Sequence, residues 1–434
     1  MQKAQSHHIR TSQVIVRKHD ECFRDIAYVC QISRRIKNAT HYLIRHEKKS
    51  NGKPFSHSDA DKWLKSNNPD LYKKLPSAIS QRTTQIAGQE WSSFFVAKKQ
   101  FDKRPELFKA RPKPPRYANK ATTAYIGRNG FRVVEGMVYF AGDVIPPIKT
   151  QYSFNQDWNA RIGDTVLREV RFVPKGNCYI IELIVDEAKL VTNGQYCPLL
   201  DKSRHAGIDL GIDNLMAIAT NQPDIHPALV KGTGLKSINA WYNKRVAKLR
   251  SLGKYDHIQT VTNKRRRQVK DALHKASRFV ADYCVKHNIG QVVVGHNKGW
   301  KQEINIGKRN NQKFAAIPHS ILINQLCYKL ETLGITVIIR EESYTSKASA
   351  LDNDHIPTKG DDVIPIFSGR RVKRGLYKAD SGQLINADIN AALNILRKES
   401  GELVACRGLM DRPTVFYPID RVTVRKGRSM PLAA

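Results

Sequence analysis

Two aspartates stand in local sequences that suit a carboxylate to metal or acid–base chemistry. The first, Asp209, lies in the stretch 206–212, where apolar residues alternate with Asp209 and glycines. Such alternation predicts a strand whose apolar residues share one face, while Asp209 stands between Gly207 and Gly211 on the other. Because those two positions carry no side chain, a metal ion or a polymer backbone could approach the carboxylate closely.

The second aspartate, Asp388, belongs to the stretch 386–396, which has the spacing of a helix. There it shares a face with Ala391, Ala392 and Ile395, and the small alanines allow that face to approach a sheet. A carboxylate on a packed face needs a cation, a metal or hydrogen-bond donors. Asp388 could instead be only the helix N-cap, a position that suits Asp. Taken alone, Asp388 supports the N-cap interpretation and the metal-ligand interpretation equally. Its pairing with Asp209 favours the metal-ligand interpretation.

A third acid is expected, because phosphodiester cleavage with two metal ions ~3.5–4 Å apart needs several converging oxygens. The strand predicted at 292–294 ends in Gly295, with no acid, whereas the strand predicted at 335–340 is followed by Glu342. Adjacent strands lie only ~4.8 Å apart, so Glu342 could reach the same point and is the first candidate. Glu303, in a basic loop beyond the strand end, is the second. Either glutamate could also be an ordinary solvated acid.

The charge of the chain indicates a polyanionic partner. Its 434 residues include 73 Lys and Arg against 39 Asp and Glu, a formal net charge of +34. A basic but inert surface is the less favoured alternative for so large an excess, and the charges are spread over too many segments for one membrane-binding helix. Residues 231–280 contain fourteen Lys or Arg and two acids, interleaved with Trp241 and Tyr242. Cations contact phosphates and aromatic rings stack on unpaired bases, so this region is expected to bind nucleic acid.

Candidate nucleic-acid contacts also occur outside that region. They lie after the proline-rich connector 111–117, in the loop that carries Glu303, and in the basic loop 369–377. A solvated helix face would explain any one of these residues, but not all of them together. The candidates are Arg116, Tyr117, Trp241, Tyr242, Lys244, Arg245, Lys264, Arg265, Arg266, Arg267, Lys301, Arg370, Arg371, Lys373 and Arg374.

The elements that must position these residues fall into two halves. In the first, helices are predicted at 21–48, 58–66 and 77–101, and strands at 9–18, 131–134, 137–140, 166–173 and 178–186. Strand 9–18 together with 118–200 could form one antiparallel barrel into which the helices are inserted. In the second half, strands are predicted at 205–211, 215–220, 291–294 and 335–340, and helical segments at 235–288, 317–333 and 388–398. Strands alternating with helices around one sheet indicate an α/β domain.

Cysteine spacing and hydropathy exclude other classes of protein. The seven cysteines include no CxxC pair, so a Cys₄ zinc ribbon is not expected, and their scatter is typical of reduced core thiols. No apolar run approaches the ~18–20 residues of a membrane span, and the first residues have no apolar signal-peptide core. A cytoplasmic location is therefore expected.

Three motifs, in this order, resemble the TnpB family of transposon-encoded, RNA-guided DNA endonucleases, which is related to the type V CRISPR effectors. They are GIDLGI at 207–212, YTSK at 344–347 and NADINAALNIL at 386–396. The resemblance implies an RNase H-like RuvC nuclease domain, a β-barrel wedge domain and an inserted helical recognition domain. It implies the wedge at 1–20 and 116–200, the recognition domain at 21–115, RuvC at 201–346 and 384–398, a nucleic-acid-binding insert at 347–383, and a flexible tail at 399–434.

In the family, three acids bind two Mg²⁺ ions; Asp209 matches the first and Asp388 the third. The second is normally a glutamate directly after the hydrophobic strand, where this chain has Gly295. Either Glu342 replaces it from a displaced position, or the nuclease is impaired. Family members often carry a Cys₄ zinc ribbon between the last two motifs, whereas residues 347–383 contain no cysteine, so no zinc is predicted.

The sequence therefore predicts an RNA-guided, Mg²⁺-dependent DNA endonuclease of a prokaryotic transposon, acting at the nucleoid. Its partners would be a guide RNA from the transposon and double-stranded target DNA with a short flanking motif, without a membrane. The alternatives are a cleavage-impaired, repressor-like RNA-guided binder and a guide-independent transposase. Monomer and dimer are both left open.

Overall fold

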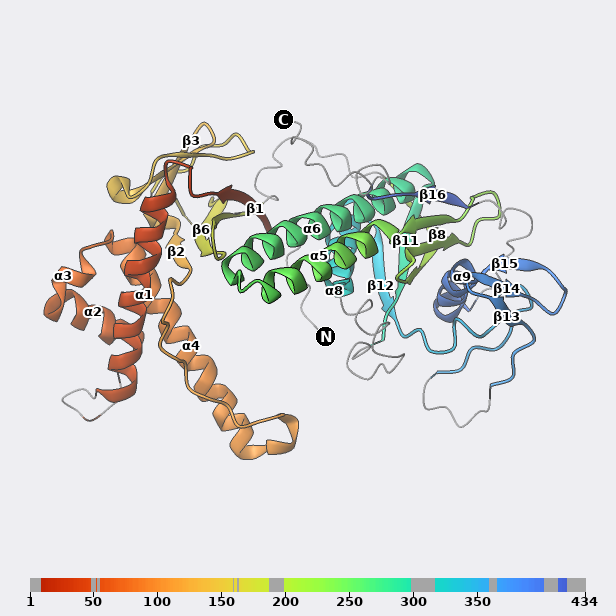
Figure 1. Cartoon of the computed structure of the whole chain (residues 1–434), viewed down its shortest axis with the longest axis horizontal. Coiled ribbons are helices and arrows are strands. Elements are labelled where there is room, and N and C mark those ends of the chain that lie inside the picture. Colours follow the sequence, from red (N-terminus) through yellow and green to blue (C-terminus); the bar gives the residue numbers. More distant parts are fainter. Residues whose placement is uncertain are drawn as a thin grey trace. The chain divides into compact units, whose positions relative to one another are not determined.

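The computed structural model divides the chain into two compact units, Met1–Gln195 and Tyr196–Ala434 (Figure 1). The structure describes residues 9–47, 52, 55–158, 160–161, 164–186, 199–297, 317–358, 365–401 and 413–419. Each unit has its own hydrophobic core. None of the helices formed by these residues combines the length and hydropathy that a membrane span requires.

Helices form one part of the first unit. They are α1 (Phe23–His46), α2 (His57–Asn67), α3 (Pro69–Tyr72), α4 (Ser77–Lys103) and the 3₁₀ turn η1 (Pro105–Leu107). The start of α2 is fixed by a capping box, in which the Ser56 side chain accepts from the Asp59 N–H and the Asp59 carboxylate accepts from the Ser56 N–H. Ile26 and Ile36 of α1 and Ile79 of α4 are fully buried in the core. The three longer helices match the predicted ones.

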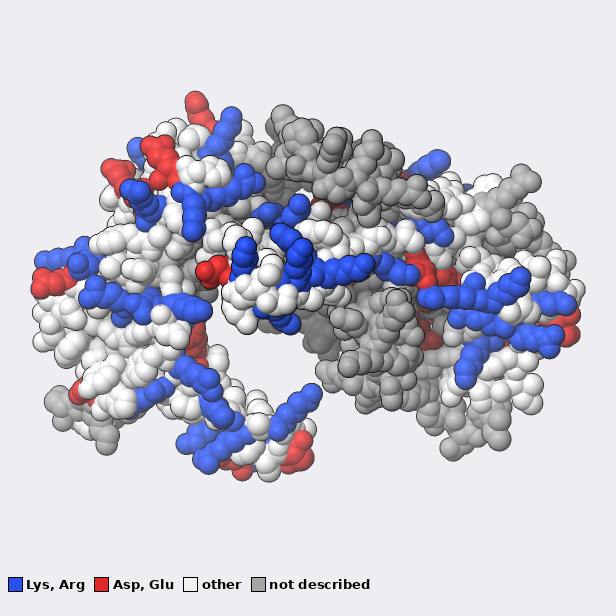
Figure 2. All heavy atoms as spheres, viewed as in Figure 1, with Lys and Arg blue, Asp and Glu red and all other residues white. Residues whose placement is uncertain are grey.

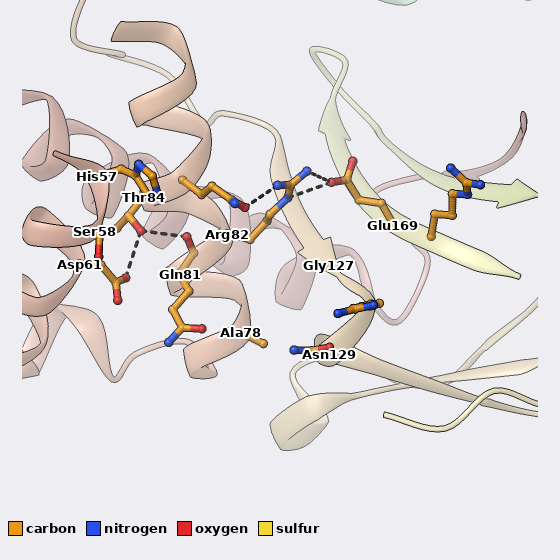
Figure 3. A pocket seen from close by; sticks show the side chains of 13 residues that line it. His57, Ser58, Asp61, Ala78, Gln81, Arg82, Thr84, Gly127, Asn129 and Glu169 are labelled. Carbon is orange, nitrogen blue, oxygen red and sulfur yellow. Dashed lines mark hydrogen bonds and ion pairs between the residues drawn. The ribbon is translucent and has the colours of Figure 1, made fainter. Parts of the chain in front are cut away.

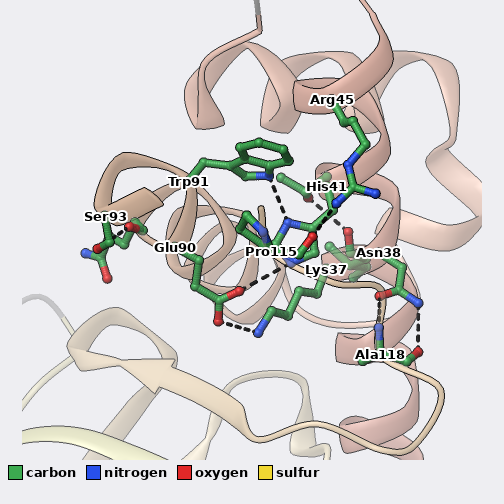
Figure 4. A network of polar contacts seen from close by, with 12 residues as sticks. Lys37, Asn38, His41, Arg45, Glu90, Trp91, Ser93, Pro115 and Ala118 are labelled. Atoms are coloured by element: carbon green, nitrogen blue, oxygen red, sulfur yellow. Dashed lines mark hydrogen bonds and ion pairs between the residues drawn. The ribbon is translucent and has the colours of Figure 1, made fainter. Parts of the chain in front are cut away.

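A polar network joins α1 to α4 (Figure 4). Trp91 Nε1 donates to Nδ1 of the buried His41 at 3.0 Å, and His41 Nε2 lies 3.3 Å from Glu90 Oε2. Glu90 also accepts from Lys37 Nζ at 2.6 Å. Since Trp91 can only donate, His41 Nδ1 must accept, and Nε2 carries the hydrogen that faces Glu90. The carboxylate of Glu90 is thus satisfied within the chain.

Two antiparallel sheets form the other part of the first unit, with strand orders β1-β7-β6-β2 and β3-β4-β5. The strands are β1 (Ile9–Val16), β2 (Ala124–Gly127), β3 (Phe131–Val134), β4 (Met137–Phe140), β5 (Ile148–Lys149), β6 (Leu167–Pro174) and β7 (Tyr179–Asp186). As predicted, β6 and β7 form a hairpin. β1 pairs with β7 although the helices lie between these two strands in the sequence. The described strands do not form the single barrel that was expected. The 3₁₀ turn η2 (Arg128–Gly130) separates β2 from β3 and leads them into different sheets.

A six-stranded mixed sheet lies at the centre of the second unit, in the order β12-β11-β8-β9-β10-β16. The strands are β8 (Asp201–Leu210), β9 (Asn214–Thr220), β10 (Ala228–Lys231), β11 (Ile289–Gly295), β12 (Thr336–Arg340) and β16 (Thr414–Phe416). β9 is antiparallel to β8 and β10, while β11 is parallel to both β8 and β12. Because parallel strands end at the same edge of a sheet, the end of β8 lies beside the ends of β11 and β12.

Helices cover both faces of this sheet. They are α5 (Thr233–Ser251), α6 (Tyr255–Lys286), α8 (His319–Thr332) and α9 (Ala387–Ser400). Ile208 and Leu210 of β8 share a core with α6 and α8, whereas Ala217 and Ala219 of β9 pack with α9 on the opposite face. The mixed α/β class predicted for this half is confirmed; the RuvC assignment stays a prediction. The names wedge and recognition domain stay predictions.

Three expectations for the second unit need correction. The helical region 235–288 is two helices, because Gly253, with φ of 66°, ends α5 in a turn. The predicted flexible tail is wrong for residues 413–419: β16 pairs with β10, and Phe416 stacks on Phe279 of α6 at 4.5 Å. The loop-rich insert contains β13 (Arg370–Lys373) and β14 (Leu376–Lys378), which form a small antiparallel sheet with β15 (Leu384–Asn386).

Candidate nuclease site and nucleic-acid surface

Asp209 stands near the end of the central strand β8, with its apolar neighbours buried on the other face, as predicted. The flanking glycines lack a side chain for a different reason from the one expected. A Cβ at position 207 would lie 2.2 Å from the carbonyl oxygen of Ala392, and one at 211 would lie 2.5 Å from that of Asn214. The bare positions therefore admit the protein's own main chain, above all helix α9.

Asp388 lies in the first turn of α9. Asn386 is the N-cap, since its side chain accepts from the N–H groups of Asp388 and Ile389, so the N-cap interpretation of Asp388 is wrong. The Asp388 carboxylate accepts from Asn214 Nδ2 at 2.6 Å, and its other oxygen pairs with Arg371 at 3.3 Å. As expected, Ala391, Ala392 and Ile395 of the same helix are buried.

Glu342 follows β12 and turns back toward the tip of β11. Its Oε2 is buried and has no hydrogen-bond partner among the described residues. A Cβ built on Gly295 would lie 2.8 Å from this oxygen. The carboxylate of Glu342 therefore reaches the space that a side chain at position 295 would enter. Gly295, which lacks a side chain, makes room for it.

The charges of Glu342 and Asp388 both act on Asp209. Burial, then the charges of Glu342 and Asp388, raise the pKa of Asp209 well above its usual range, and Arg371 opposes this. Burial and the neighbouring Glu341 raise the pKa of Glu342 to about 7. Desolvated carboxylates with an unpartnered oxygen are relieved by a cation, so a divalent metal ion is the kind of ligand that their chemistry suits. Over the described ranges, however, no group of three His, Cys, Asp or Glu side chains is arranged to hold a metal ion, so the acids would have to move closer together to share one.

A cavity of about 590 Å³ opens beside Asp388. Lys231 Nζ donates to Asn214 Oδ1 at 2.7 Å on its wall, and Arg374 pairs with Asp213. Nothing in the local sequence of Asn214 indicates that it holds Asp388. The cavity combines the acid of the site with a basic rim, as a phosphate-binding cleft would.

The predicted basic region is a surface of the α5–α6 pair. Lys and Arg side chains line these helices in the centre of the view, and others lie over β13 and β14 (Figure 2). Trp241 is 44% exposed, with Lys264 Nζ 5.6 Å from its ring centroid. The expected stacking role of Tyr242 is not supported, because its hydroxyl bonds Thr262 and the Arg265 guanidinium lies 5.2 Å from its ring. Among the predicted contacts, the exposed cations here are Lys244, Arg245, Lys264, Arg266 and Arg267.

The remaining candidates are divided between three places. Arg370, Arg371, Lys373 and Arg374 are exposed on β13 and its turn, where two of them pair with acids of the site as described above. Arg116 and Tyr117 are exposed in the first unit, and Arg45 lies 4.9 Å from the Tyr117 ring. Lys301 and Glu303 lie outside the described residues.

The first unit contains a separate cavity of about 540 Å³ between α2, α4 and the strand ends (Figure 3). Arg82, on its wall, donates to Glu169 at 3.0 Å. Gln81, Asn129 and Arg128 are among the other lining residues. No sequence motif pointed to this cavity.

Comparisons with known proteins identify the type of chain. Residues 191–301 match the family OrfB_IS605, described as a probable transposase, and residues 319–395 match the family described as Cas12f1-like, TNB domain. The TnpB-like protein ORF457 of Acidianus two-tailed virus is 26% identical over 213 residues, which are 46% of this chain and 42% of that relative. Over these residues the chain is similar to TnpB-type proteins. The match spans less than half of the curated relative.

The chain was also compared with solved structures. A Cas12f1–sgRNA–target DNA complex gives a TM-score of 0.34 at 15% identity, covering 89% of this chain and 98% of that chain. The mini RNA-guided endonuclease CRISPR-Cas_phi3 gives 0.42 at 10% identity, covering 92% and 93%. These TM-scores are too low to support an inference about the site.

Proposed function

We propose that this TnpB-type protein is an RNA-guided DNA endonuclease whose carboxylates are Asp209, Glu342 and Asp388. The observation that supports this most strongly is the position of Glu342. Its unpartnered oxygen lies 2.8 Å from where a side chain at Gly295 would begin, and its charge acts on Asp209. Glu342 would thus replace, from the neighbouring strand, the acid that is missing at the tip of β11.

The site would work with Mg²⁺, whose preferred ligands are carboxylate oxygens. When bound, divalent cations supply the Lewis acidity that activates water and stabilises the leaving oxygen. Asp209 and Glu342 would lose their protons to solvent and hold such ions as carboxylates. Asp388 would exchange its contacts with Asn214 and Arg371 for the metal. Arg371, once released, is placed to contact a phosphate at the cavity beside it.

The partners would be a guide RNA and target DNA. The exposed cations of α5, α6 and β13 offer phosphate contacts that do not depend on sequence. In RNA-guided effectors generally, base pairing reads the target while the protein reads the shape of the heteroduplex and a short flanking motif. We extend that division of labour to this chain on the basis of its TnpB type.

Plasmid cleavage by the full chain with its co-purified RNA and Mg²⁺ tests this function. Asp209→Asn and Glu342→Gln should each lose on the order of 10²–10⁴-fold in rate, because transition-state charge would lose several kcal/mol of stabilisation. Target binding, measured by gel shift, should stay near that of the wild type. Glu303→Gln, which changes a glutamate of the competing loop in the same way, should cut normally.

The other outcomes identify the alternatives. If Glu303→Gln is inactive while Glu342→Gln cuts like the wild type, the third carboxylate is Glu303. A wild type that binds target but never cuts would be a repressor-like binder. Strand-transfer products made without a guide would indicate a transposase.

A further inference from the structure

Three asparagines lie four residues apart along α9: Asn386, Asn390 and Asn394. Residues at this spacing share one face of a helix. Asn386 caps the helix, whereas Asn390 and Asn394 are inside it and are fully buried. Burying an amide is costly unless all of its polar atoms find partners, so these two side chains need an explanation beyond helix formation.

Their main-chain partners lie in the irregular segment that follows β12, and Asn394 Oδ1 also accepts from Arg397 Nη1 at 2.9 Å. Asn390 donates to the carbonyl oxygen of Ala348 at 2.8 Å and accepts from the N–H of Ala350 at 2.9 Å. Asn394 donates to the carbonyl oxygens of Thr345 at 2.9 Å and Ala348 at 2.7 Å. The two amides therefore fasten this segment to the helix along its main chain.

Thr345 continues the connection to Glu342. Its Oγ1 donates to the carbonyl oxygen of Glu342 at 2.8 Å, while the Glu342 N–H donates to Asn297 Oδ1 at 3.1 Å. Between them Tyr344 has φ of 66°, a conformation that side-chain-bearing residues adopt only when their surroundings impose it. Without its attachment to α9, this turn would relax.

We propose that Asn394, assisted by Asn390, is a positioning residue that holds the loop of Glu342 against the helix that bears Asp388. The inference rests on the proposed function, because it concerns the same carboxylates. A glutamate at the tip of a strand is held by the sheet itself. A glutamate on a loop needs other supports, and groups that orient metal ligands commonly change metal affinity 10–100-fold when removed.

The test measures Mn²⁺ binding to the full chain, freed of RNA in high salt, by electron paramagnetic resonance. Asn394→Ala should raise the Mn²⁺ dissociation constant about 10–100-fold. Ser277→Ala is the matched control: Ser277 is buried between α6 and α8, where it donates to His274 O at 3.1 Å, and it lies apart from the site. It should lower the melting temperature comparably and leave Mn²⁺ binding unchanged.

Thr345→Val provides a milder second variant, because it removes one hydroxyl and keeps the shape of the side chain. It should weaken Mn²⁺ binding about 3–10-fold, and it decides the question if Asn394→Ala does not fold. A stability loss in either variant without any change in Mn²⁺ affinity would make the asparagine a structural residue only. Failure of the proposed function shows elsewhere: Glu342→Gln would then bind Mn²⁺ as the wild type does, or the wild type would bind none.

Discussion

Two glutamates, one in each unit, have pKa values that are shifted in opposite directions. At Glu90, burial raises the pKa, but contacts with His41 and Lys37 of the same chain outweigh the effect of burial and lower the pKa (Figure 4). Glu342 has no such partner within the described residues, and burial raises its pKa to about 7. The first carboxylate completes a network that the fold already contains. The second leaves an incomplete network that a cation from outside the chain would complete.

The difference distinguishes a structural carboxylate from one that is available to a ligand. An unsatisfied buried acid costs stability, so its retention needs a reason beyond packing. Glu342 is also the acid that fills the space at Gly295. The two residues differ in burial, since the Glu90 side chain is 41% exposed, and they differ in having or lacking internal partners.

The largest effect should come from moving the carboxylate back to the strand. In a Glu342→Gln background, Gly295→Glu should restore cleavage at least about tenfold, because the new side chain starts beside the oxygen it replaces. The atoms in its way are the flexible ends of residue 342 and Ile395. Gly295→Gln in the same background has the same size without the charge and should restore nothing. Equal rates for these two double variants would mean that the carboxylate is not needed there.

Part of this site could be predicted from the sequence. Asp209 and Asp388 stand in local patterns that determine a strand face and a helix face, and Glu342 follows from the spacing of adjacent strands. The contact between Gly295 and Glu342 could not be predicted, because it depends on the path of a loop that Asn394 fastens from 49 positions away in the chain. The same holds for Asn214, whose partner Asp388 is distant in sequence.

The fold, like the site, has parts that could be predicted from the sequence and parts that could not. Helices and hairpins with strong periodicity matched their predictions closely. The strand β16 was missed because three residues carry no periodic signal and pair only with the distant β10. The burial of Tyr242 between two helices depends on how α5 meets α6, which local sequence does not determine.

A smaller effect is expected on how the stability of the folded state depends on pH in the absence of metal ions. The pKa of Glu342 is raised on folding, so its ionised form destabilises the native state: stability falls as pH rises from about 4.5, the unfolded value, to about 7. Glu342→Gln removes this cost, and by removing one charge it also lets Asp209 ionise more easily. In EDTA at pH 8 it should be more stable than the wild type by on the order of 1–3 kcal/mol, with little difference at pH 4.5.

Thermal melts at the two pH values measure this gain. Excess Mg²⁺ at pH 8 should reverse the order by stabilising the wild type alone. A variant that is equally stable at both pH values would mean that Glu342 is solvated.

The smallest effect, with the opposite sign, is expected at Glu90. Glu90→Gln removes the ion pair with Lys37 and weakens the contact with His41, so it should destabilise the first unit by about 0.5–1.5 kcal/mol, since the Glu90 side chain is 41% exposed and partly screened. Because the pKa of Glu90 is lowered, the stabilisation is present above the unfolded value and lost as pH falls through the folded one. Urea unfolding followed by tryptophan fluorescence measures this loss of stability. Glu106→Gln, an exposed control on η1, should change nothing. Stabilisation by Glu90→Gln at neutral pH would remove the contrast, because both glutamates would then be unsatisfied acids.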